Sequence, residues 1–248
     1  MIVLKSAREI TYLREAGRIT ALALQELGKR IRPGVTTGEL NQFTEDFLRR
    51  SGAIPAFLGY HGFPASICTS VNSEVVHGIP GLRKLENGDI ISIDIGTVYR
   101  EYYGDAAATF PVGEISPEAS RLLEVTQKAL YLGIAQAVAG NRIGDISAAI
   151  QTFVESNGFH VVRDFVGHGI GRNMHEEPQV PNFGKPGLGP RLQPGLVLAI
   201  EPMVNAGTSE VCVMPDRWTV VTKDGSLSAH FEHTVLVTEG EPEILTRL

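Results

Sequence analysis

Four acidic residues stand inside segments whose other residues are typical of β-strands. They are Asp94 in the run ISIDIGTV, Asp105 in YGDAAATF, Glu201 in LVLAIEPMV and Glu232 in HFEHTVLVT. Acidic residues are depleted in strands, so four of them in this setting form an unusual pattern. Because side chains alternate between the faces of a strand, each acid shares its face with mostly small or polar neighbours, opposite a more apolar face. We therefore expect the four carboxylates to line a cleft on one face of a sheet.

Carboxylates crowded on one face repel one another unless cations neutralise them or some of them take up protons. Any one of these acids alone is most simply explained as a solvated surface residue. The four together favour bound divalent metal ions, for which carboxylate oxygens are hard ligands. His168, in the run GHGIG, is a candidate fifth ligand. Five such ligands exceed what one zinc ion of the usual histidine-rich type takes, and they suit two metal ions about 3.5–4 Å apart.

Two common motifs are excluded near these residues. The glycine-rich loop around His168 is no phosphate cradle, because no Gly-Lys-Ser/Thr follows it and no dinucleotide fingerprint fits. The run His175-Glu176-Glu177-Pro178 is no HExxH zinc motif, because residue 179 is Gln and the proline would break the helix that the motif needs.

The surrounding segments predict four helices and several strands. The first helix has capping-box spacing between Ser6 and Glu9, and the third begins with a serine cap followed by proline. Expected helices cover 6–33, 36–52, a segment from 116 with Leu122, Val125, Ala129 and Leu132 buried, and about 145–157. Expected strands cover 65–71, 90–98, 102–112, 196–201, 217–222 and 229–238.

The order helix, helix, strands occurs twice. Several glycines and a phenylalanine recur at a constant offset of 106, as Gly34 and Gly140 do, and Ile93-Asp94 recurs as Ile200-Glu201 at an offset of 107. We interpret this as a duplication within one α/β domain spanning 1–248, with halves of roughly 1–112 and 113–248. The two halves are expected to pack into one sheet with helices on one face.

Composition narrows the class of protein. The net charge is −6 and the pI about 5.7, which disfavours stable nucleic-acid binding. Two cysteines, Cys68 and Cys212, without a CxxC pair fit a reducing cytosol better than a disulfide framework. The start of the chain lacks the apolar core of a signal peptide, and no apolar stretch has the length of a membrane span. We expect a cytoplasmic monomer with no membrane contact.

In order and spacing, the five candidate ligands resemble those of the bacterial type I methionine aminopeptidases. The resemblance is to the catalytic domain of that family only. The resemblance covers essentially the whole chain. It is carried by the runs GYHGFPASICTSVN, HGIP, IDIG, GHGIGRNMHEEPQVPNF, IEPMVNAG and FEHTVLVTEGEPEILT. The fold that it implies is the pita-bread fold, a pseudo-twofold pair of helix-helix-strand halves around a curved antiparallel sheet with helices on the outer face. That fold agrees with the internal repeat.

The resemblance implies metal-dependent removal of the N-terminal methionine from nascent proteins that have a small second residue. Asp94 would chelate one metal ion, His168 and Glu201 the other, and Asp105 and Glu232 would bridge the two. A metal-bound water would attack the scissile carbonyl, with Glu201 taking its proton and later delivering one to the leaving amine. Manganese, iron or cobalt suits these ligands best, and zinc is compatible.

Two further histidines take catalytic and substrate-binding roles by resemblance. His175 would stabilise the oxyanion or the substrate carbonyl, and His77 would contact the scissile amide nitrogen. The competing interpretation of His77, beside Gly-Ile-Pro, is that it only holds a turn. The implied methionine pocket consists of Tyr60, His61, Phe63, Cys68, Met174 and Trp218. Phe63, Met174 and Val76 stand where many family members have Tyr, Phe and Cys, and we expect these changes to tune the pocket and the preference for the second residue.

Other functions compete with this one. A proline-specific peptidase of the same fold usually carries a large N-terminal domain, which we do not expect because the catalytic pattern begins at residue 6. A type II methionine aminopeptidase has a helical insertion between His175 and Glu201, where this chain has only 25 residues. A non-catalytic binding protein on the same scaffold would lose metal ligands, and all five are present. Transient contact with ribosomes is compatible with the acidic pI.

Overall fold

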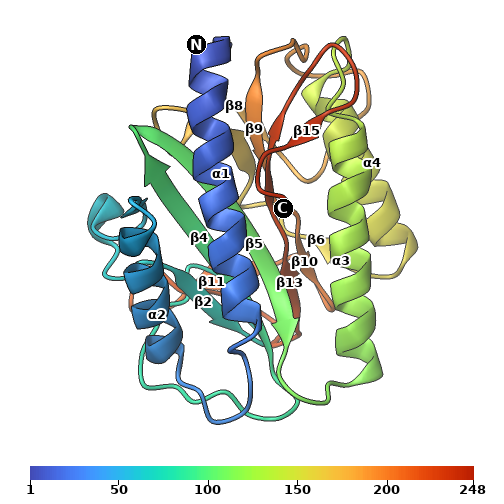
Figure 1. Cartoon of the computed structure of the whole chain (residues 1–248). Helices are drawn as coiled ribbons and strands as arrows, with labels where there is room; N and C mark the ends of the chain where they lie inside the picture. The colour runs from blue at the N-terminus through green and yellow to red at the C-terminus, as the bar shows by residue number, and fades with distance from the viewer.

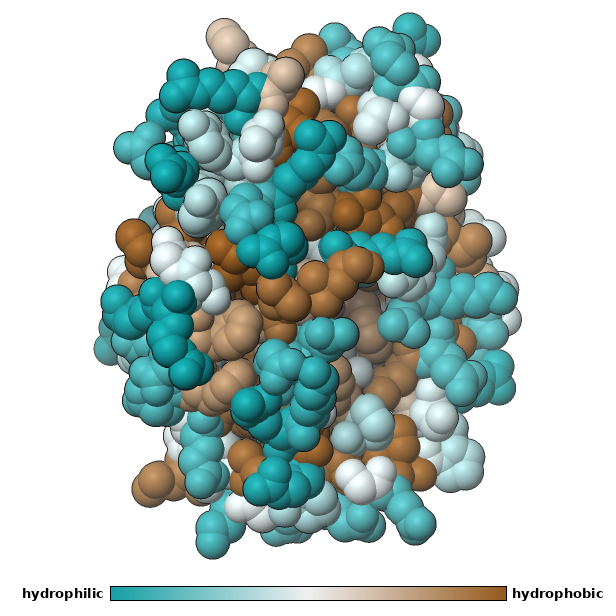
Figure 2. Space-filling view, viewed as in Figure 1, coloured by the Kyte–Doolittle hydropathy of each residue, from teal (hydrophilic) through white to brown (hydrophobic).

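Four helices cover one side of the strands in the computed structural model, which describes residues 1–248 (Figure 1). They are α1 (Ala7–Gly28), α2 (Thr37–Arg50), α3 (Pro117–Ala135) and α4 (Ile143–Ser156), and a short 3-10 helix, η1, spans Tyr60–Gly62. Ser6 and Thr36 accept hydrogen bonds from the backbone N–H groups three residues later, and the glutamates there bond back, so α1 and α2 begin at capping boxes. The four predicted helices are present, but α1 ends at Gly28, five residues before the predicted end at residue 33. On the face seen in Figure 2, hydrophilic residues cover most of the rim, and apolar residues show mainly in the middle of the face.

Hydrogen bonds group the strands into four antiparallel sheets with the orders β1-β4-β2 (β5 on β4), β13-β10-β6, β11-β12-β3 and β15-β14-β9-β7-β8. The strands of the first half are β1 (Ile54–Pro55), β2 (Cys68–Val71), β3 (Glu74–Val76), β4 (Ile90–Tyr99) and β5 (Tyr102–Pro111). Those of the second half are β6 (His160–Val161), β7 (Gly167–Gly169), β8 (Glu176–Val180), β9 (Val197–Ile200), β10 (Met203–Asn205), β11 (Val211–Val213), β12 (Val220–Thr222), β13 (Ser228–His230), β14 (His233–Leu236) and β15 (Glu243–Ile244). Several are shorter than predicted, and the expected strand 229–238 is interrupted at Phe231 and Glu232.

The backbone of the second half repeats that of the first. Helices α2 and α4 both have 14 residues and begin 106 positions apart, at residues 37 and 143. Strands β1 and β6 begin at residues 54 and 160, again 106 apart. Isolated bridges recur too, since Thr36 pairs with Lys84 and Arg142 pairs with Arg191. The chain therefore has the pseudo-twofold α/β architecture that the sequence predicts.

The two halves meet along a seam between β5 and the β13–β14 segment, and threonine hydroxyls complete the hydrogen bonding there. Thr234 Oγ1 accepts from the backbone N–H of Asp105 at 3.0 Å and donates to its carbonyl at 2.8 Å. Thr109 Oγ1 accepts from the N–H of His230 at 2.9 Å and donates to its carbonyl at 2.9 Å. The N–H of Glu232 donates to a carbonyl of β5 between them, at 2.9 Å. The seam thus places acids of the two halves beside each other.

Apolar clusters fill the space between the helices and the strands. The larger lies under α3 and α4 and a second lies under α1 and α2, where Ile91, Ile93 and Ile95 of β4 are fully buried. Burying each of these side chains stabilises the fold by about 1.5–3 kcal/mol. Their face of β4 is opposite to Asp94, as the alternating pattern predicts. No helix has both the length and the apolar character needed to cross a membrane.

One predicted core residue is wrong. Leu132 of α3 is 36% exposed, whereas Leu122, Val125 and Ala129 are buried as predicted. The buried stripe of α3 continues through Leu130 instead, because at 3.6 residues per turn position 132 turns towards solvent.

Candidate metal and substrate site

The residues with predicted roles meet at one cavity of about 240 Å³. Its lining consists of Phe57, Tyr60, His61, Phe63, Cys68, His77, Asp94, Asp105, His168, Met174, His175, Glu201, Trp218 and Glu232. Every residue that the sequence predicts to bind metal or substrate is in this lining, and the fold therefore brings the whole predicted set together. Phe57 is the member that sequence reasoning missed, although it precedes Tyr60 by only three positions in the same aromatic run.

The β4–β5 hairpin supplies two of the acids. Its strands are joined by a two-residue turn in which Arg100 and Glu101 have positive φ angles of 47° and 70°, the turn that suits the twist of a hairpin. The register pairs Gly96 with Asp105 and places Asp94 one step along the same face. The two carboxylates are therefore diagonal neighbours, close enough to act together.

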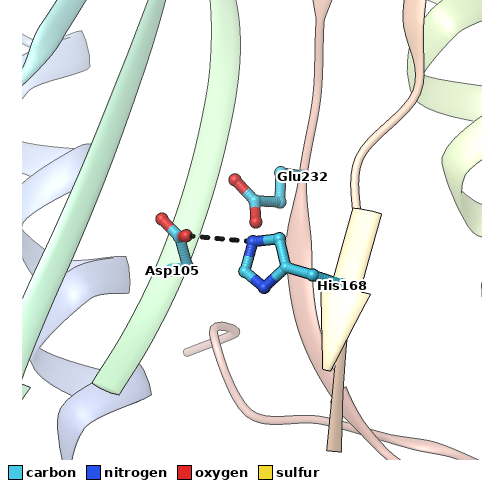
Figure 3. Close-up of side chains that lie close together, drawn as sticks. All are labelled: Asp105, His168 and Glu232. Carbon is cyan, nitrogen blue, oxygen red and sulfur yellow. Dashed lines mark ion pairs between the residues drawn. The ribbon is translucent and has the colours of Figure 1, made fainter. Parts of the chain in front are cut away.

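The second half supplies the other ligands, opposite the hairpin. Nε2 of His168 lies 3.5 Å from Oε1 of Glu201 and 3.8 Å from Oδ2 of Asp105. One ligand atom each from Asp105, His168 and Glu232 lies within 4.8 Å of the others, and Figure 3 shows the three side chains facing one another. Nδ1 of His168 pairs with the carbonyl of Gly169 at 2.9 Å and so carries the proton, which leaves the lone pair of Nε2 for a metal ion.

Burial sets the protonation of this group. It raises the pKa of Asp94 to about 7 and that of Glu201 to about 8. Burial, with neighbouring carboxylates second, raises the pKa values of Asp105 and Glu232 well above the usual range. Asp105 is only 5% exposed and Glu232 only 2%, so the interpretation of these acids as solvated surface residues is wrong.

The donor set fits divalent metal ions. One carboxylate oxygen each of Asp94, Asp105 and Glu232 is buried without a hydrogen-bond partner. A buried carboxylate oxygen without a partner is costly, and coordination to a cation supplies the partner and offsets the charge. Burial lowers the pKa of His168 to about 4, so its imidazole is neutral at pH 7, the form that binds metals.

Two more histidines line the same cavity. The Tyr60 hydroxyl is 2.7 Å from Nδ1 of His175, whose ring centroid lies 4.3 Å from that of His168. His77 has a positive φ of 60°, a strained conformation that is concentrated at functional sites, and its ring packs edge-on against Phe165. Burial lowers the pKa of His77 to about 4 and also lowers that of His175, so both imidazoles are neutral at pH 7.

The remaining wall is mainly apolar. The rings of Phe63 and Trp218 meet edge to face with centroids 5.1 Å apart. Gly96 lies so close to the wall that a Cβ there would stand 2.5 Å from Cε1 of Phe57 and 2.6 Å from Cε of Met174. The cavity lining therefore combines acids and imidazoles with aromatic rings and one thioether.

Comparisons with known proteins agree with this geometry. The model of metallopeptidase family M24 matches residues 11–239. The chain belongs to metallopeptidase family M24. It is 57% identical to a Bacillus subtilis relative named methionine aminopeptidase 1 over 248 residues, which cover 100% of both chains. The crystal structure of a methionine aminopeptidase from Thermotoga maritima matches with a TM-score of 0.99 and 48% identity, with 100% of each chain covered.

More distant M24 structures share the fold. Prolidase from Pyrococcus furiosus matches with a TM-score of 0.79 at 23% identity, and the match covers 99% of this chain and 66% of the prolidase. The prediction of a pita-bread fold is thereby confirmed. Membership of M24 also confirms that the chain is a metallopeptidase, a hydrolase that uses divalent metal.

Two residues outside the predicted set lie beside Glu201 in this M24 site. Nε2 of His230 has no hydrogen-bond partner and lies 3.7 Å from Oε2 of Glu201, and Asn182 donates to the Glu201 carbonyl at 3.1 Å. In the sequence, the only signal for His230 is its position two residues before Glu232, on the same face of the expected strand.

Val76, expected to tune the pocket, packs instead in an apolar cluster and is not part of the cavity lining.

Proposed function

We propose that this M24 enzyme removes the N-terminal methionine from polypeptides that have a small second residue. The observation that carries the proposal is a single cavity whose lining combines buried, unpartnered carboxylate oxygens with an apolar wall. The apolar wall suits an unbranched thioether side chain. Full-length relatives named methionine aminopeptidases support the same function.

We propose that Asp94, Asp105, His168, Glu201 and Glu232 hold two divalent metal ions, with manganese, iron or cobalt best suited and zinc compatible. When bound, these ions would activate a water molecule and polarise the scissile carbonyl. With metal ions bound in place of its proton, the Glu201 carboxylate would take a proton from the water and return it to the leaving amine.

The two cavity histidines have separate proposed roles. With Nδ1 of His175 engaged by Tyr60, Nε2 is the nitrogen left to donate a hydrogen bond to the substrate carbonyl oxygen. His77, fixed by its backbone conformation and by Phe165, would contact the scissile amide nitrogen. Because both rings are neutral at pH 7, neither adds a positive charge that would compete with metal ions.

Metal add-back to stripped protein tests the function directly. We expect free methionine to appear from Met-Gly-x peptides only after a divalent ion is added, and x-Pro-x peptides to stay intact. The peptide products are separated by mass, and the ions are compared at equal free concentration. Cleavage of x-Pro-x instead would assign the chain to the proline-specific branch. A folded protein that turns over neither peptide with any metal would be a binding module.

Replacing Trp218 by Ala tests the apolar pocket. We expect KM for Met-Gly-x to rise about tenfold and kcat to change less, because the lost aromatic wall, worth about 1.5–3 kcal/mol when buried, binds ground and transition states alike. The contrast between N-terminal methionine and leucine should also weaken. Phe43→Ala on α2, a partly buried ring far from the cavity lining, is the matched control. An unchanged KM in Trp218→Ala would remove this residue from the substrate pocket.

We also propose that the chain works as one domain spanning 1–248, as a cytoplasmic monomer acting on nascent polypeptides. Both halves of the same chain contribute ligands to the one cavity, which supports a site completed within a single chain. The net charge of −6 supports at most transient contact with ribosomes and no stable complex with nucleic acid.

A further inference from the structure

A buried ion pair connects the start of the chain to the segment that carries His175. Nζ of Lys5 lies 2.5 Å from Oε2 of Glu176, and the two side chains are only 4% and 13% exposed. The residues are 171 positions apart, so the contact belongs to the tertiary fold alone. Breaking a buried pair by removing one partner is strongly unfavourable, because the other charge is left uncompensated.

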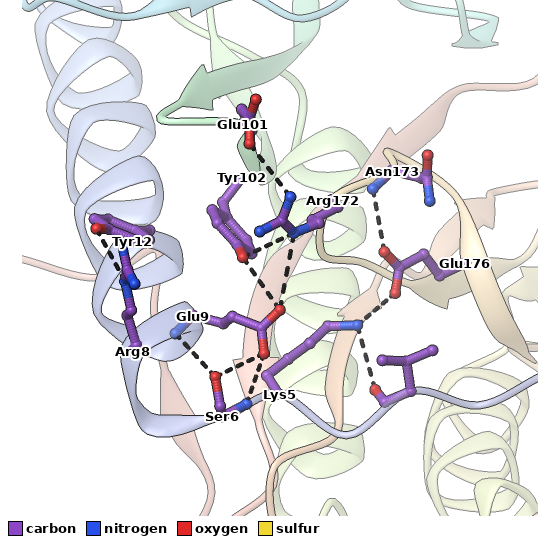
Figure 4. A network of polar contacts seen from close by, with 11 residues as sticks. Lys5, Ser6, Arg8, Glu9, Tyr12, Glu101, Tyr102, Arg172, Asn173 and Glu176 are labelled. Atoms are coloured by element: carbon purple, nitrogen blue, oxygen red, sulfur yellow. Dashed lines mark hydrogen bonds and ion pairs between the residues drawn. The ribbon is translucent and has the colours of Figure 1, made fainter.

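The same carboxylate shapes the segment 171–176. Oε1 of Glu176 accepts a hydrogen bond from the backbone N–H of Asn173 at 3.1 Å, which closes a turn around Met174 and His175, both in the cavity lining (Figure 4). Gly171 lies directly against the pair, since a Cβ there would stand 2.5 Å from Cε of Lys5 and 2.7 Å from Oε1 of Glu176. The turn and the pair are therefore packed as one unit.

The backbone of Lys5 is anchored on the other half of the site. Its N–H donates to the carbonyl of Gly195 at 2.7 Å, and the N–H of Gly195 donates to the carbonyl of Val237 at 3.0 Å. Gly195 leads into β9, which ends directly before Glu201. Lys5 thus spans the gap between the His175 segment and the strand that delivers Glu201.

The other ion pairs of this segment are exposed. Arg172 donates to the Tyr102 hydroxyl at 2.9 Å and to Glu101 at 3.3 Å, but the side chains of Arg172 and Glu101 are 61% and 80% exposed (Figure 4). Exposed ion pairs contribute little to stability. Among the ion pairs of this segment, the buried pair of Lys5 is therefore the one best able to fix its backbone.

We propose that Lys5 is a positioning residue for His175, acting through its buried ion pair with Glu176. This inference rests on the function proposed above, in which His175 donates to the substrate carbonyl. Lys5 touches no substrate. It fixes the turn that sets where the imidazole points, and a misplacement of about 1 Å at such a group is sufficient to cost about 10²-fold in rate.

A double-mutant cycle tests this role. We expect Lys5→Met to lower kcat for Met-Gly-x at least tenfold in the wild-type background and less than twofold in a His175→Ala background, because the loss acts through His175. Arg14→Met, which breaks an exposed ion pair of α1 with Glu243, is the matched control and should keep the wild-type rate. Equal losses in both backgrounds, or no loss in either, would overturn the proposal.

Amide hydrogen exchange gives a second readout that needs no turnover. We expect exchange in residues 171–176 to be at least tenfold faster in Lys5→Met and unchanged in Arg14→Met. Unchanged exchange in Lys5→Met would overturn the positioning role. A wild-type protein that releases no methionine would contradict the proposed function, while the exchange result would still decide whether Lys5 orders the turn.

Gly171→Ala covers the case in which Lys5→Met does not fold. This variant keeps both charges and only pushes the ends of the two side chains apart, and the φ of Gly171 is not in the left-handed region. We expect it to lower kcat and to speed exchange in the same segment. Wild-type values for both quantities would overturn the proposal.

Discussion

We expect Glu201→Gln to lower kcat for methionine release by on the order of 10²–10⁴, the usual contribution of a general acid or base. Glutamine has nearly the same shape, and the bond from Asn182 to the backbone carbonyl of residue 201 is kept, but the amide cannot take up the proton. The fold should survive, because burial already disfavours the charged carboxylate at this position. The measurement is steady-state release of methionine at saturating metal, together with thermal unfolding of the metal-free protein.

Glu241→Gln provides the control for that result, since it makes the same chemical change at an exposed site near the C-terminus. It should leave both kcat and the unfolding temperature unchanged. If Glu201→Gln, saturated with metal, kept more than about a tenth of the wild-type kcat, the residue would have no part in proton transfer.

We expect metal ions to stabilise the protein far more at pH 8 than at pH 6. Burial raises the pKa of Asp94 to about 7 and that of Glu201 to about 8 in the metal-free protein. A carboxyl whose pKa is raised on folding contributes most stability below its unfolded value, near 4, and loses that contribution as the pH rises towards the folded value. Each of these shifts corresponds to on the order of 4 kcal/mol at pH 8. Metal ions replace the protons and remove this cost.

Thermal unfolding with and without Mn²⁺, measured at pH 6, at pH 8 and at one value between them, tests this expectation. For a chain of this length a gain of about 4 kcal/mol raises the midpoint by about 10 °C, which we expect at pH 8, with a much smaller rise at pH 6. Asp94→Asn should reduce the difference between the two pH values, because one of the titrating groups is gone. An equal rise at every pH would show that the metal does not bind these carboxylates.

The acid cluster was predictable because it breaks a local rule. Acids inside strands are rare, and alternation along β4 places Asp94 opposite the buried Ile91, Ile93 and Ile95. Strand composition and alternation depend only on residues that are close in the chain, so a single sequence is enough to recognise them. The cavity lining followed from a resemblance that spans the chain, which carries spatial information that alternation lacks.

Helix starts were predictable where the cap is local and less so elsewhere. The capping boxes at Ser6 and Thr36 have a recognisable spacing. Helix α4 begins at Ile143, two residues before the predicted start, because Asp145 accepts from the N–H of Arg142 and so lies in the third helical position. An acidic residue in the first turn is easily mistaken for the cap itself.

Contacts made across the molecule were not predictable. Thr109 and His230 are 121 positions apart, and Lys5 and Glu176 are 171 apart. Nothing in the residues around Lys5 distinguishes a buried lysine from a solvated one. Likewise, the break between β13 and β14 at Phe231 and Glu232 follows from pairing with β5 across the seam, where Glu232 bonds to a strand of the other half.

The seam between β5 and the β13–β14 segment also makes the two sides of the cavity chemically different. Thr109 and Thr234 occupy equivalent places on its two sides, 125 positions apart, because each bonds to the backbone of the opposite side. The same offset relates Asp105 to His230, and it relates a β5 alanine to Glu232. A cavity with true twofold symmetry would accept a peptide equally well in two opposed orientations, and only one of them places the amino end correctly. Here the backbone keeps the symmetry, while an acid in one half occupies the position that a histidine occupies in the other. A peptide bond has distinct acyl and amine ends, and unlike side chains on a symmetric frame can tell them apart.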